Sequence, residues 1–436
     1  MRALAAALCL LTAGCGPQMR YRVTVLPAGI VELDRPMDVA PGMELRGAPG
    51  GTTLHMANGF QGAAAVVVQG DNVRLHDFEI DGNRAALEVR QGLPEYDQPF
   101  SRFTTRNGIQ VDGKSHVQID HVRLRNVAGF AILASRTAYL QASRITVIDS
   151  GSRNPAGRNN ATGGILVEEG SSHFVVEASS FRNILGNALW THSLYRSARN
   201  RDGVFARNHI DRVGRDAIQA GHATAMRVED NIMTHVGFPV DATDLEARAI
   251  PVGIDTAGNV DATAYVGNRI AEINGKCMDL DGLHDSEIRG NECVNSGDPK
   301  AYPLANYAIV MNDTNPDMKT RNIRIVGNRV ERMLFGAIFV IGERNIIERN
   351  LLLDLNLAHC NQNVAHYACM YAAADPQLLA SGIYLGRGAE RPAPARGNVV
   401  RSNVITGWGM KLGCVTSAPD IPAAWNMVKG NECIER

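Results

Sequence analysis

A short apolar strand motif recurs from residue 107 to the C-terminus, and this repeat constrains the fold more than any other feature of the sequence. One apolar residue marks each copy: Ile109, Ile132, Ile165, Leu189, Ile218, Ile254, Met278, Ile309, Ile338 and Ile383. A second marker is asparagine, at Asn208, Asn231, Asn268, Asn291, Asn328, Asn350, Asn403 and Asn431. Their spacings indicate a unit of about 23 residues with occasional insertions. A repeat of this length built from short strands predicts a β-solenoid whose apolar markers stack into one inward ladder.

The aligned asparagines predict a corner that repeats in every coil, because asparagine tolerates a left-handed backbone and bonds to nearby backbone groups. This is the asparagine-ladder pattern of right-handed parallel β-helices, and the chain resembles the pectin-lyase-like superfamily over roughly residues 24 to 436. Residues 26–29 and 70–73 look like parts of the first coils of such proteins. The resemblance implies an all-β protein whose residues 16–436 form a single-domain right-handed parallel β-helix of about 11–13 coils.

The composition and the N-terminus restrict partners and location. A net charge of −1 with 20% charged residues provides no basic field, so we expect no nucleic-acid partner. One arginine and an apolar run over residues 3–11 predict a signal peptide over residues 1–15, too short to span a membrane. The sequence Thr12-Ala13-Gly14-Cys15 resembles a bacterial lipobox, which implies lipidation of Cys15; an ordinary secretory signal is the alternative. We therefore expect an exported, monomeric cell-envelope protein that faces the periplasm or the exterior and touches the membrane only through a lipid anchor.

Six cysteines follow the leader segment, and an even number in an exported chain favours disulfides. Their placement predicts three local bonds, which join Cys277 to Cys293, Cys360 to Cys369, and Cys414 to Cys433. The sequence contains no C-x-x-C motif and no cluster of histidines and cysteines, so it predicts no metal site.

Three aspartates mark the predicted catalytic centre. Equivalent residues on neighbouring coils lie about 4.8 Å apart, so outward side chains form ladders. The position after each inward marker holds Asp255 and Asp279 on adjacent coils, and Asp281 follows two residues later. Crowded carboxylates raise at least one pKa, which provides a general acid beside a general base. The adjacent pair fits the gap of roughly 5 Å in retaining glycosidases, whereas the diagonal pair approaches the wider gap of inverting ones, so both outcomes stay open.

Other residues near these aspartates in the repeat are interpreted as substrate-binding residues: His192, His222, His284, Lys276, Trp190 and Asn312. The aspartates resemble those of the polygalacturonase family of glycoside hydrolases, which carries three aspartates on consecutive coils beside a Gly-His-Gly motif. Here Gly221 and His222 precede the aspartates and Ala223 replaces the second glycine. The resemblance therefore extends to the three aspartates alone.

Insertions in the repeat also indicate where a substrate binds. Five segments fall near the start of the strands that carry the outward ladder: residues 152–162, 238–251, 296–306, 357–381 and 387–397. Loops beside a rigid scaffold commonly form a cleft, so we expect these segments to wall the acidic residues.

The sequence favours a glycoside hydrolase that acts on a polysaccharide or oligosaccharide and needs no cofactor. In this interpretation Asp279 or Asp281 is the general acid and Asp255 is the base or nucleophile. A polysaccharide lyase or uronate epimerase is the first alternative, with one of the three histidines as base and with Lys276 or aspartate-bound Ca²⁺ as the neutralising cation. The scarcity of lysine and arginine on the ladders argues against an acidic substrate. A noncatalytic sugar-binding or structural surface lipoprotein is the second alternative.

Overall fold

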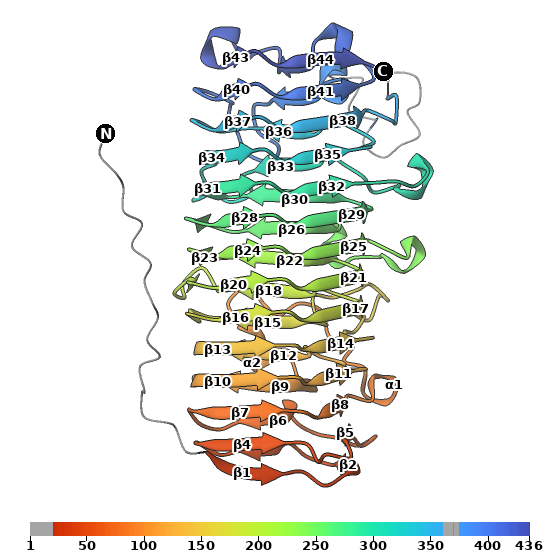
Figure 1. Ribbon diagram of the computed structural model, residues 1–436, viewed down its shortest axis with the longest axis vertical. Helices are drawn as coiled ribbons and strands as arrows, with labels where there is room; N and C mark the ends of the chain where they lie inside the picture. The colour runs from red at the N-terminus through yellow and green to blue at the C-terminus, as the bar shows by residue number, and fades with distance from the viewer. Residues whose placement is uncertain (1–20, 361–368, 370–374) are drawn as a thin grey trace, which may run out of the picture.

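Three parallel β-sheets run the length of an elongated solenoid in the computed structural model, which describes residues 21–360, 369 and 375–436 (Figure 1). The first coils lie at one end of the solenoid and the last coils at the other (Figure 1). The predicted signal peptide over residues 1–15, with Cys15, lies outside the described residues. Within those residues, no helix combines the length and the apolar character needed to cross a membrane.

Each coil contributes strands to all three sheets, which we name A, B and C. Sheet A contains β1 (Arg22–Val25), β4 (Met43–Arg46), β7 (Val73–His76), β10 (Ser115–Asp120), β13 (Ala138–Ser143), β16 (Val175–Glu177), β19 (Asn200–Arg201), β20 (Val204–Ala206), β23 (Ala223–Thr224), β24 (Arg227–Glu229), β27 (Val260–Asp261), β28 (Ala264–Val266), β31 (Leu283–Arg289), β34 (Arg321–Val326), β37 (Ile346–Glu348), β40 (Val399–Arg401) and β43 (Met427–Lys429). Sheet B contains β2 (Gly29–Leu33), β5 (Thr52–Met56), β8 (Glu79–Asp81), β11 (Arg123–Arg125), β14 (Thr146–Ile148), β17 (Ser180–Ile184), β21 (His209–Val213), β25 (Ile232–Val236), β29 (Arg269–Ile273), β32 (Glu292–Val294), β35 (Arg329–Glu331), β38 (Leu351–Leu355), β41 (Val404–Gly407) and β44 (Glu432–Glu435).

Sheet C carries the residues of functional interest. It contains β3 (Met37–Val39), β6 (Ala64–Val68), β9 (Asn107–Asp112), β12 (Ile132–Ser135), β15 (Ile165–Glu168), β18 (Leu189–His192), β22 (Asp216–Gly221), β26 (Val252–Ala257), β30 (Lys276–Asp281), β33 (Ile309–Asn312), β36 (Ile338–Val340), β39 (Ile383–Leu385) and β42 (Val415–Ser417). The loops hold short helices: α1 (Arg84–Leu87), α2 (Phe100–Phe103), η1 (Val240–Ala242), η2 (Glu246–Arg248), η3 (Pro299–Ala301), η5 (Pro376–Leu379), η6 (Met410–Leu412) and η7 (Ala423–Trp425).

The ten apolar markers stack inside the coil in the predicted register. Each pairs with its counterpart on the next coil, from Ile109 beside Ile132 to Ile338 beside Ile383. None of the ten is more than 2% exposed. Because one coil cannot bury its apolar face alone, this ladder joins the coils into a single core. The predicted all-β solenoid is confirmed.

The asparagine ladder is also present, but its backbone differs from the prediction. Asn208 donates its side-chain amide to Asn231 Oδ1 at 3.0 Å, and the same contact repeats along the ladder to Asn431. The left-handed backbone lies one residue earlier, for example at Arg207 and Gly267 with φ of 53° and 65°. The asparagines therefore do not supply the left-handed corner, and their buried amides instead link successive coils.

The three predicted disulfides are confirmed: Cys277 bonds to Cys293, Cys360 to Cys369, and Cys414 to Cys433. The first lies inside the coil, where both cysteines are at most 3% exposed, and it ties β30 to β32. Three disulfides are typical of an exported protein.

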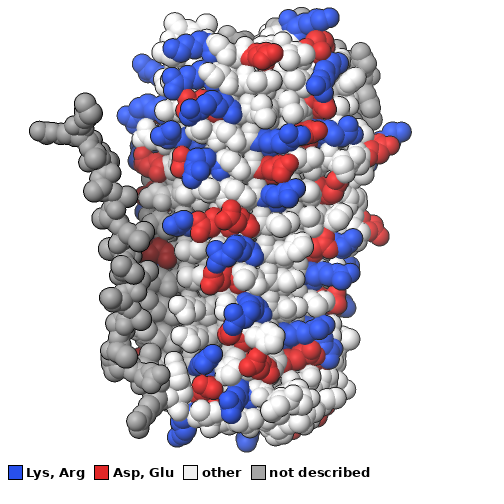
Figure 2. Space-filling model, in the orientation of Figure 1, with Lys and Arg blue, Asp and Glu red and all other residues white. Residues whose placement is uncertain are grey.

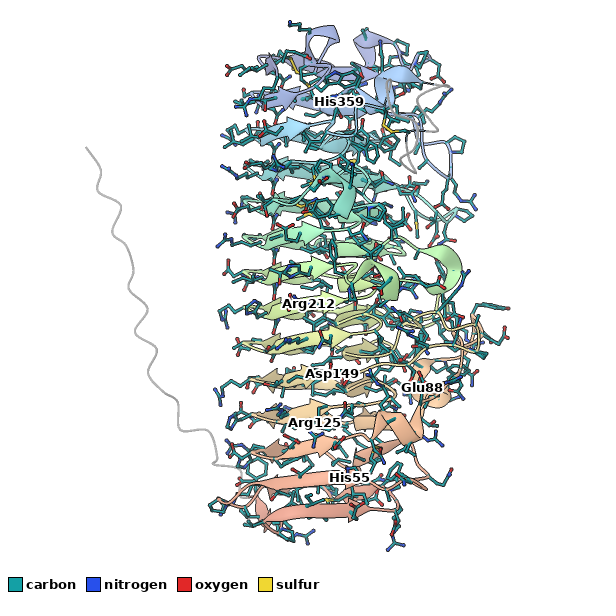
Figure 3. All side chains as sticks on the ribbon, turned by 90° about the vertical axis from the view of Figure 1, so that its right-hand side faces the viewer. His55, Glu88, Arg125, Asp149, Arg212 and His359 are labelled. Carbon is teal, nitrogen blue, oxygen red and sulfur yellow. A yellow bond between two sulfur atoms is a disulfide. The ribbon has the colours of Figure 1, made fainter. Side chains whose placement is uncertain are left out.

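The outer faces of sheets A and B are polar and of mixed charge. Figure 2 shows basic and acidic side chains interspersed over the face that it presents, and Figure 3 labels Arg125 and Arg212 along sheet B. Arg125 lies 2.6 Å from Glu79 and 2.7 Å from Asp81, so here cations and carboxylates neutralise one another. Such partly exposed pairs add little stability individually, about 0–1 kcal/mol.

Candidate active site

Two apolar clusters cover most of the outer face of sheet C and leave a polar gap between them. The first contains Phe100, Phe130, Leu133, Ala161, Leu166 and Trp190, with Phe100 of α2 lying over the strands. The second, toward the C-terminus, surrounds Val310 and Tyr384. Between the clusters the outward ladder consists of Gln219, Asp255 and Asp279 on the adjacent strands β22, β26 and β30. Between the two clusters the ladder therefore carries carboxylates in place of apolar side chains.

Asp255 and Asp279 occupy paired positions on adjacent strands, as the repeat predicts. The side-chain amide of Gln219 donates to Asp255 Oδ2 at 2.7 Å and fixes that carboxyl. Lys276 forms an ion pair with Asp279, and the two side chains are only 16% and 13% exposed. Asp279 Oδ1 is buried and has no hydrogen-bond partner among the described residues, so it is free to meet a ligand or water.

Asp281 closes the same strand, where it pairs in register with Asn312 of β33. The backbone N–H of Thr314 donates to Asp281 Oδ1 at 2.9 Å, and the Thr314 hydroxyl donates to Oδ2. Asn312 donates to Glu390 Oε1 at 3.3 Å and contacts no aspartate of the gap through a hydrogen bond among the described residues. The loop after β33 thus orients Asp281, while Asn312 orients the loop after β39.

Asp216 belongs to this group, although the repeat pattern did not predict it. It is 3% exposed, its Oδ2 lies 3.9 Å from Arg215 Nε, and its Oδ1 has no hydrogen-bond partner among the described residues. It lies two residues before the inward marker, at the position that Lys276 occupies two coils later. The sequence did contain a clue to Asp216. A side chain two residues before the inward marker should also face the core, yet this position holds a charged residue in two of the coils. We call Asp216, Asp255, Lys276, Asp279 and Asp281 the acidic centre.

Burial and crowding shift the proton affinities in the acidic centre. Burial raises the pKa of Asp255 well above its usual range, and the charges of Asp216 and Asp279 raise it further. Burial likewise raises the pKa of Asp216, against the charge of Arg215. Burial raises the pKa of Asp281 to about 6 in spite of its hydrogen bonds from Thr314.

Lys276 balances part of this charge. Burial acts to lower the pKa of Lys276, but the carboxylates of Asp279, Asp255 and Asp281 outweigh it, so the pKa is raised and the ammonium stays charged. Asp255, whose raised pKa favours its protonated form, therefore lies beside Asp279, which is ion-paired with Lys276. This arrangement can donate a proton at one position and hold or accept positive charge at the next.

The histidines do not converge on the aspartates as predicted. The His192 ring lies 5.3 Å from the Trp190 ring and 5.9 Å from the His222 ring, and His222 packs 4.4 Å from Tyr195, centroid to centroid. Among the described residues, no hydrogen bond or ion pair joins either histidine to the acidic centre. Burial lowers the pKa of His192 to about 3 and also lowers the pKa of His222. Both rings are therefore neutral at ordinary pH.

His284 is placed elsewhere, and Trp190 is no open stacking surface. His284 lies 2.8 Å from both Asp285 Oδ2 and Asn259 Oδ1 and is 9% exposed, so it joins sheet A strands. Trp190 is 7% exposed because Phe100 packs against it with ring centroids 4.9 Å apart. The repeat aligned these residues along the chain correctly, but loop packing determined what each side chain meets.

Loops wall the polar gap on both sides. Before the strands of sheet C, Asn154 of segment 152–162 donates to Glu246 of segment 238–251 at 3.1 Å. Residues 387–397 were predicted to lie near the start of the sheet C strands. This prediction is wrong, because the segment follows β39 and lies at the opposite end of the strands. There Arg391 Nε donates to the Thr314 carbonyl at 2.8 Å, and Asn315 bonds to the Tyr195 hydroxyl. Loops therefore lie at both ends of the strands that carry the polar gap.

One group of side chains has the spacing of metal ligands. Single ligand atoms of Glu168, Glu169 and His192 lie within 4.8 Å of one another. Both Glu168 oxygens already accept backbone N–H groups, from Phe100 at 2.9 Å and Ser101 at 2.8 Å, and Glu169 accepts one from Leu194. These carboxylates therefore have an evident structural role, which is to hold the loops around the first apolar cluster.

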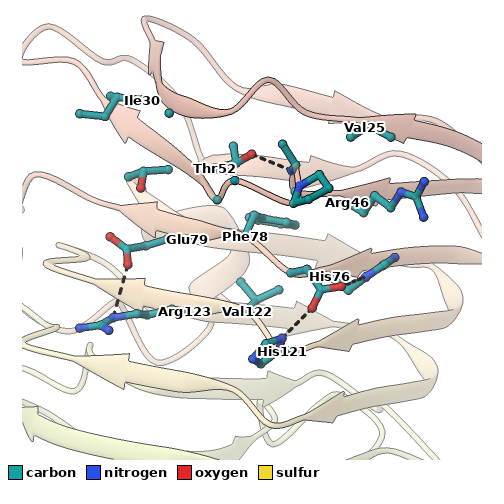
Figure 4. A pocket seen from close by; sticks show the side chains of 18 of the residues that line it. Val25, Ile30, Arg46, Thr52, His76, Phe78, Glu79, His121, Val122 and Arg123 are labelled. Atoms are coloured by element: carbon teal, nitrogen blue, oxygen red, sulfur yellow. Dashed lines mark hydrogen bonds and ion pairs between the residues drawn. The ribbon is translucent and has the colours of Figure 1, made fainter.

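A large surface hollow lies far from the acidic centre along the chain. It has a volume of about 940 Å³ and is formed by the first coils (Figure 4). Figure 4 shows His76, His121 and Glu79 in this hollow, which we call the N-terminal groove. Its carboxylates already have close side-chain partners: His121 lies 2.6 Å from Asp77, and Arg123 lies 3.4 Å from Glu79. Size alone therefore does not locate the chemistry.

Comparison with known proteins identifies the fold. The family model described as a right-handed beta helix region matches residues 64–247. The chain folds as a right-handed parallel β-helix. No curated protein sequence matches the chain.

Solved structures with this β-helix differ widely in what they do. The tailspike protein of E. coli bacteriophage HK620, solved in complex with a pentasaccharide, is 11% identical with a TM-score of 0.59, covering 91% of this chain and 71% of the tailspike. The Yersinia enterocolitica family 28 exopolygalacturonase is 12% identical with a TM-score of 0.55, covering 78% and 70%. PfbA, a surface adhesin of Streptococcus pneumoniae, is 12% identical with a TM-score of 0.51, covering 76% and 80%. At these identities the likeness shows the fold alone.

Proposed function

We propose that the protein is a glycoside hydrolase acting on a polysaccharide or oligosaccharide bound over the acidic centre of sheet C. The observation that carries the proposal is the acidic centre, in which Asp255, with its raised pKa, lies beside the ion-paired Asp279 between the two apolar clusters. Glycosidases need this pair of states, since one carboxyl must protonate the leaving oxygen while another is ionised. The sugar-bound tailspike and the exopolygalacturonase support a carbohydrate ligand for this fold.

The structure favours roles that differ from the sequence-based interpretation. Asp255 is the general acid, because its raised pKa keeps the proton available and Gln219 orients it. Asp281 is the general base, because a pKa of about 6 leaves it ionised at neutral pH and Thr314 fixes it. The diagonal across adjacent strands spans roughly 7–8 Å, within the gap that inverting enzymes need for water. Asp279 stabilises the positive charge that develops on the sugar.

The lyase and epimerase alternatives have weaker support. Both need a base and a cation around an acidic sugar, but His192 and His222 form a separate cluster and Lys276 is already paired with Asp279. A noncatalytic binding role remains the second alternative, since a surface adhesin has a similar fold, and the experiment below distinguishes it. We further propose that the chain is exported as a monomer and anchored through lipidated Cys15, which the mass of the mature N-terminal peptide checks.

A digestion in heavy-oxygen water tests the function. The mature protein is incubated with a panel of polysaccharides and oligosaccharides, and products are analysed by mass. We expect new reducing ends that carry one heavy oxygen, with inversion at the anomeric carbon observed by NMR. Unsaturated products would identify a lyase, and retention of a glycan without cleavage would identify a binding protein.

A further inference from the structure

A cavity of about 180 Å³ adjoins the acidic centre on its N-terminal side. Gln219 lines this cavity and also bonds to Asp255, so the cavity leads to the proposed general acid. Phe100 and Trp190 of the first apolar cluster also line it. Segment 93–98 lines it as well, and Arg196 Nη2 tethers this segment by donating to the Asp97 carbonyl at 2.6 Å. We call this cavity the chamber.

Arg215 gives this chamber guanidinium donors that lack a hydrogen-bond partner among the described residues. Its side chain is 14% exposed, and its Nε and Nη1 are buried without a hydrogen-bond partner among the described residues. The nearest carboxylate, Asp216, lies 3.9 Å from Nε, beyond hydrogen-bond distance. Arg125 on sheet B, by contrast, has two close carboxylates at 2.6 and 2.7 Å. Buried guanidinium donors without a partner are uncommon and indicate a group that binds there.

The other polar residues that line the chamber provide no further cation and no buried carboxylate that would repel an anion. His192 lines it as a neutral ring because burial lowers its pKa to about 3. Glu95 lies exposed at the rim and Tyr96 is 90% exposed, so both remain in contact with water. Arginine is well suited to carboxylate and sulfate oxygens, since it presents several donors in a planar array.

We propose that this chamber binds one sugar residue of the substrate and that Arg215 holds an anionic substituent of that residue, either a carboxylate or a sulfate ester. The place of this sugar residue beside the cleaved bond rests on the proposed function, but its binding does not. This proposal differs from the sequence-based expectation that the substrate is not acidic. That expectation rested on the scarcity of lysine and arginine on the outward ladders, and Arg215 lies outside those ladders.

Binding calorimetry tests the proposal on the full mature protein carrying Asp255→Asn, so that turnover does not interfere. The probes are hexuronates, hexose 6-sulfates and the corresponding neutral hexoses, each also as the terminal residue of a disaccharide. We expect the best charged sugar to bind at least about tenfold more tightly than its neutral counterpart, which corresponds to one charged hydrogen-bonded contact. Preference for the uronate or the sulfate identifies which anion the chamber takes.

Three further variants make the result specific. Arg215→Gln should abolish the preference for charged sugars, Arg215→Lys should retain part of it, and Arg212→Gln should leave it intact because Arg212 pairs with Asp211 on sheet B. Unfolding temperatures confirm that each variant is folded. Equal binding of charged and neutral sugars, or an undiminished preference in Arg215→Gln, would overturn the proposal. Charged-sugar binding without any hydrolysis would contradict the proposed function alone, whereas hydrolysis of neutral chains without charge preference would contradict this inference alone.

Discussion

The N-terminal groove and the acidic centre both place carboxylates on concave surfaces, yet their electrostatics are opposite. In the groove, hydrogen bonds from His121 and His76 lower the pKa of Asp77, whose side chain is 52% exposed. In the acidic centre, burial raises the pKa of Asp255 and of Asp281. Paired carboxylates in water are held ionised, whereas crowded buried ones keep a proton that they can donate. Burial and unbalanced negative charge, and not the volume of a surface hollow, therefore distinguish the candidate active site from the N-terminal groove.

Replacing the same residue type in the two regions should give the largest contrast. Asp255→Asn should lower turnover by about 10²- to 10⁴-fold, since it removes the proton donor. Its unfolding temperature should stay unchanged or rise, because a carboxyl with a raised pKa destabilises the fold once ionised. Steady-state kinetics with a cleaved substrate and scanning calorimetry measure both. Full activity in this variant would remove Asp255 from the mechanism.

The buried cation should matter more for stability than any cation in the groove. Lys276→Gln leaves Asp279 without its ion-pair partner, which costs about 3–5 kcal/mol when one member of a buried pair is removed. Part of the loss should be recovered at acidic pH, because the unpaired carboxylates then take up protons. Denaturant unfolding at two pH values measures this, with exposed Lys300→Gln as the matched control. Equal stability of the two variants would show that the ion pair contributes little.

Stability and activity should depend on pH through Asp281 of the acidic centre. Asp281 binds its proton more tightly in the folded state, so the unfolding free energy falls as pH rises from about 4 to about 6. Activity should rise over the ionisation of Asp281 near pH 6. Thr314→Val removes a hydrogen bond that lowers this pKa, so the rising limb of activity should move to higher pH.

A threonine on sheet B provides the control for this shift. Thr234 donates to Asp211 Oδ1 at 2.9 Å and helps to lower the pKa of that carboxyl. Thr234→Val should therefore leave the activity profile in place. Coincident pH profiles for Thr314→Val and the unmodified protein would contradict the role of Asp281 as base.

The smallest effect is expected in the groove. Asp77→Asn should lower the unfolding free energy by about 0.2–1 kcal/mol at neutral pH, because solvent screens half-exposed pairs. The lowered pKa means that this contribution is present above the usual aspartate pKa and disappears as pH falls through the folded-state value. Turnover should be unchanged. A loss of activity comparable to that of Asp255→Asn would transfer the catalytic site to the groove.

The repeat pattern alone predicted the solenoid, its register and part of the candidate site. A strict repeat forces equivalent residues onto neighbouring coils, so the stacking of Ile254 on Met278 and the adjacency of Asp255 and Asp279 followed directly. The local disulfides followed from cysteine spacing because their partners lie within one coil or one loop.

Which groups form the acidic centre, and how their pKa values are shifted, depends on the folded chain. Asp216 and Lys276 lie where strands begin, so simple alternation of side chains does not place them. His192 and His222 do not contact the aspartates, because the loop residues Phe100 and Tyr195 pack against them. Loops do not follow the repeat, so the repeat does not predict these contacts. The raised pKa values depend on burial between two apolar clusters, which are assembled by insertions of irregular length. Repeat positions are encoded locally, whereas desolvation is a property of everything that surrounds a side chain.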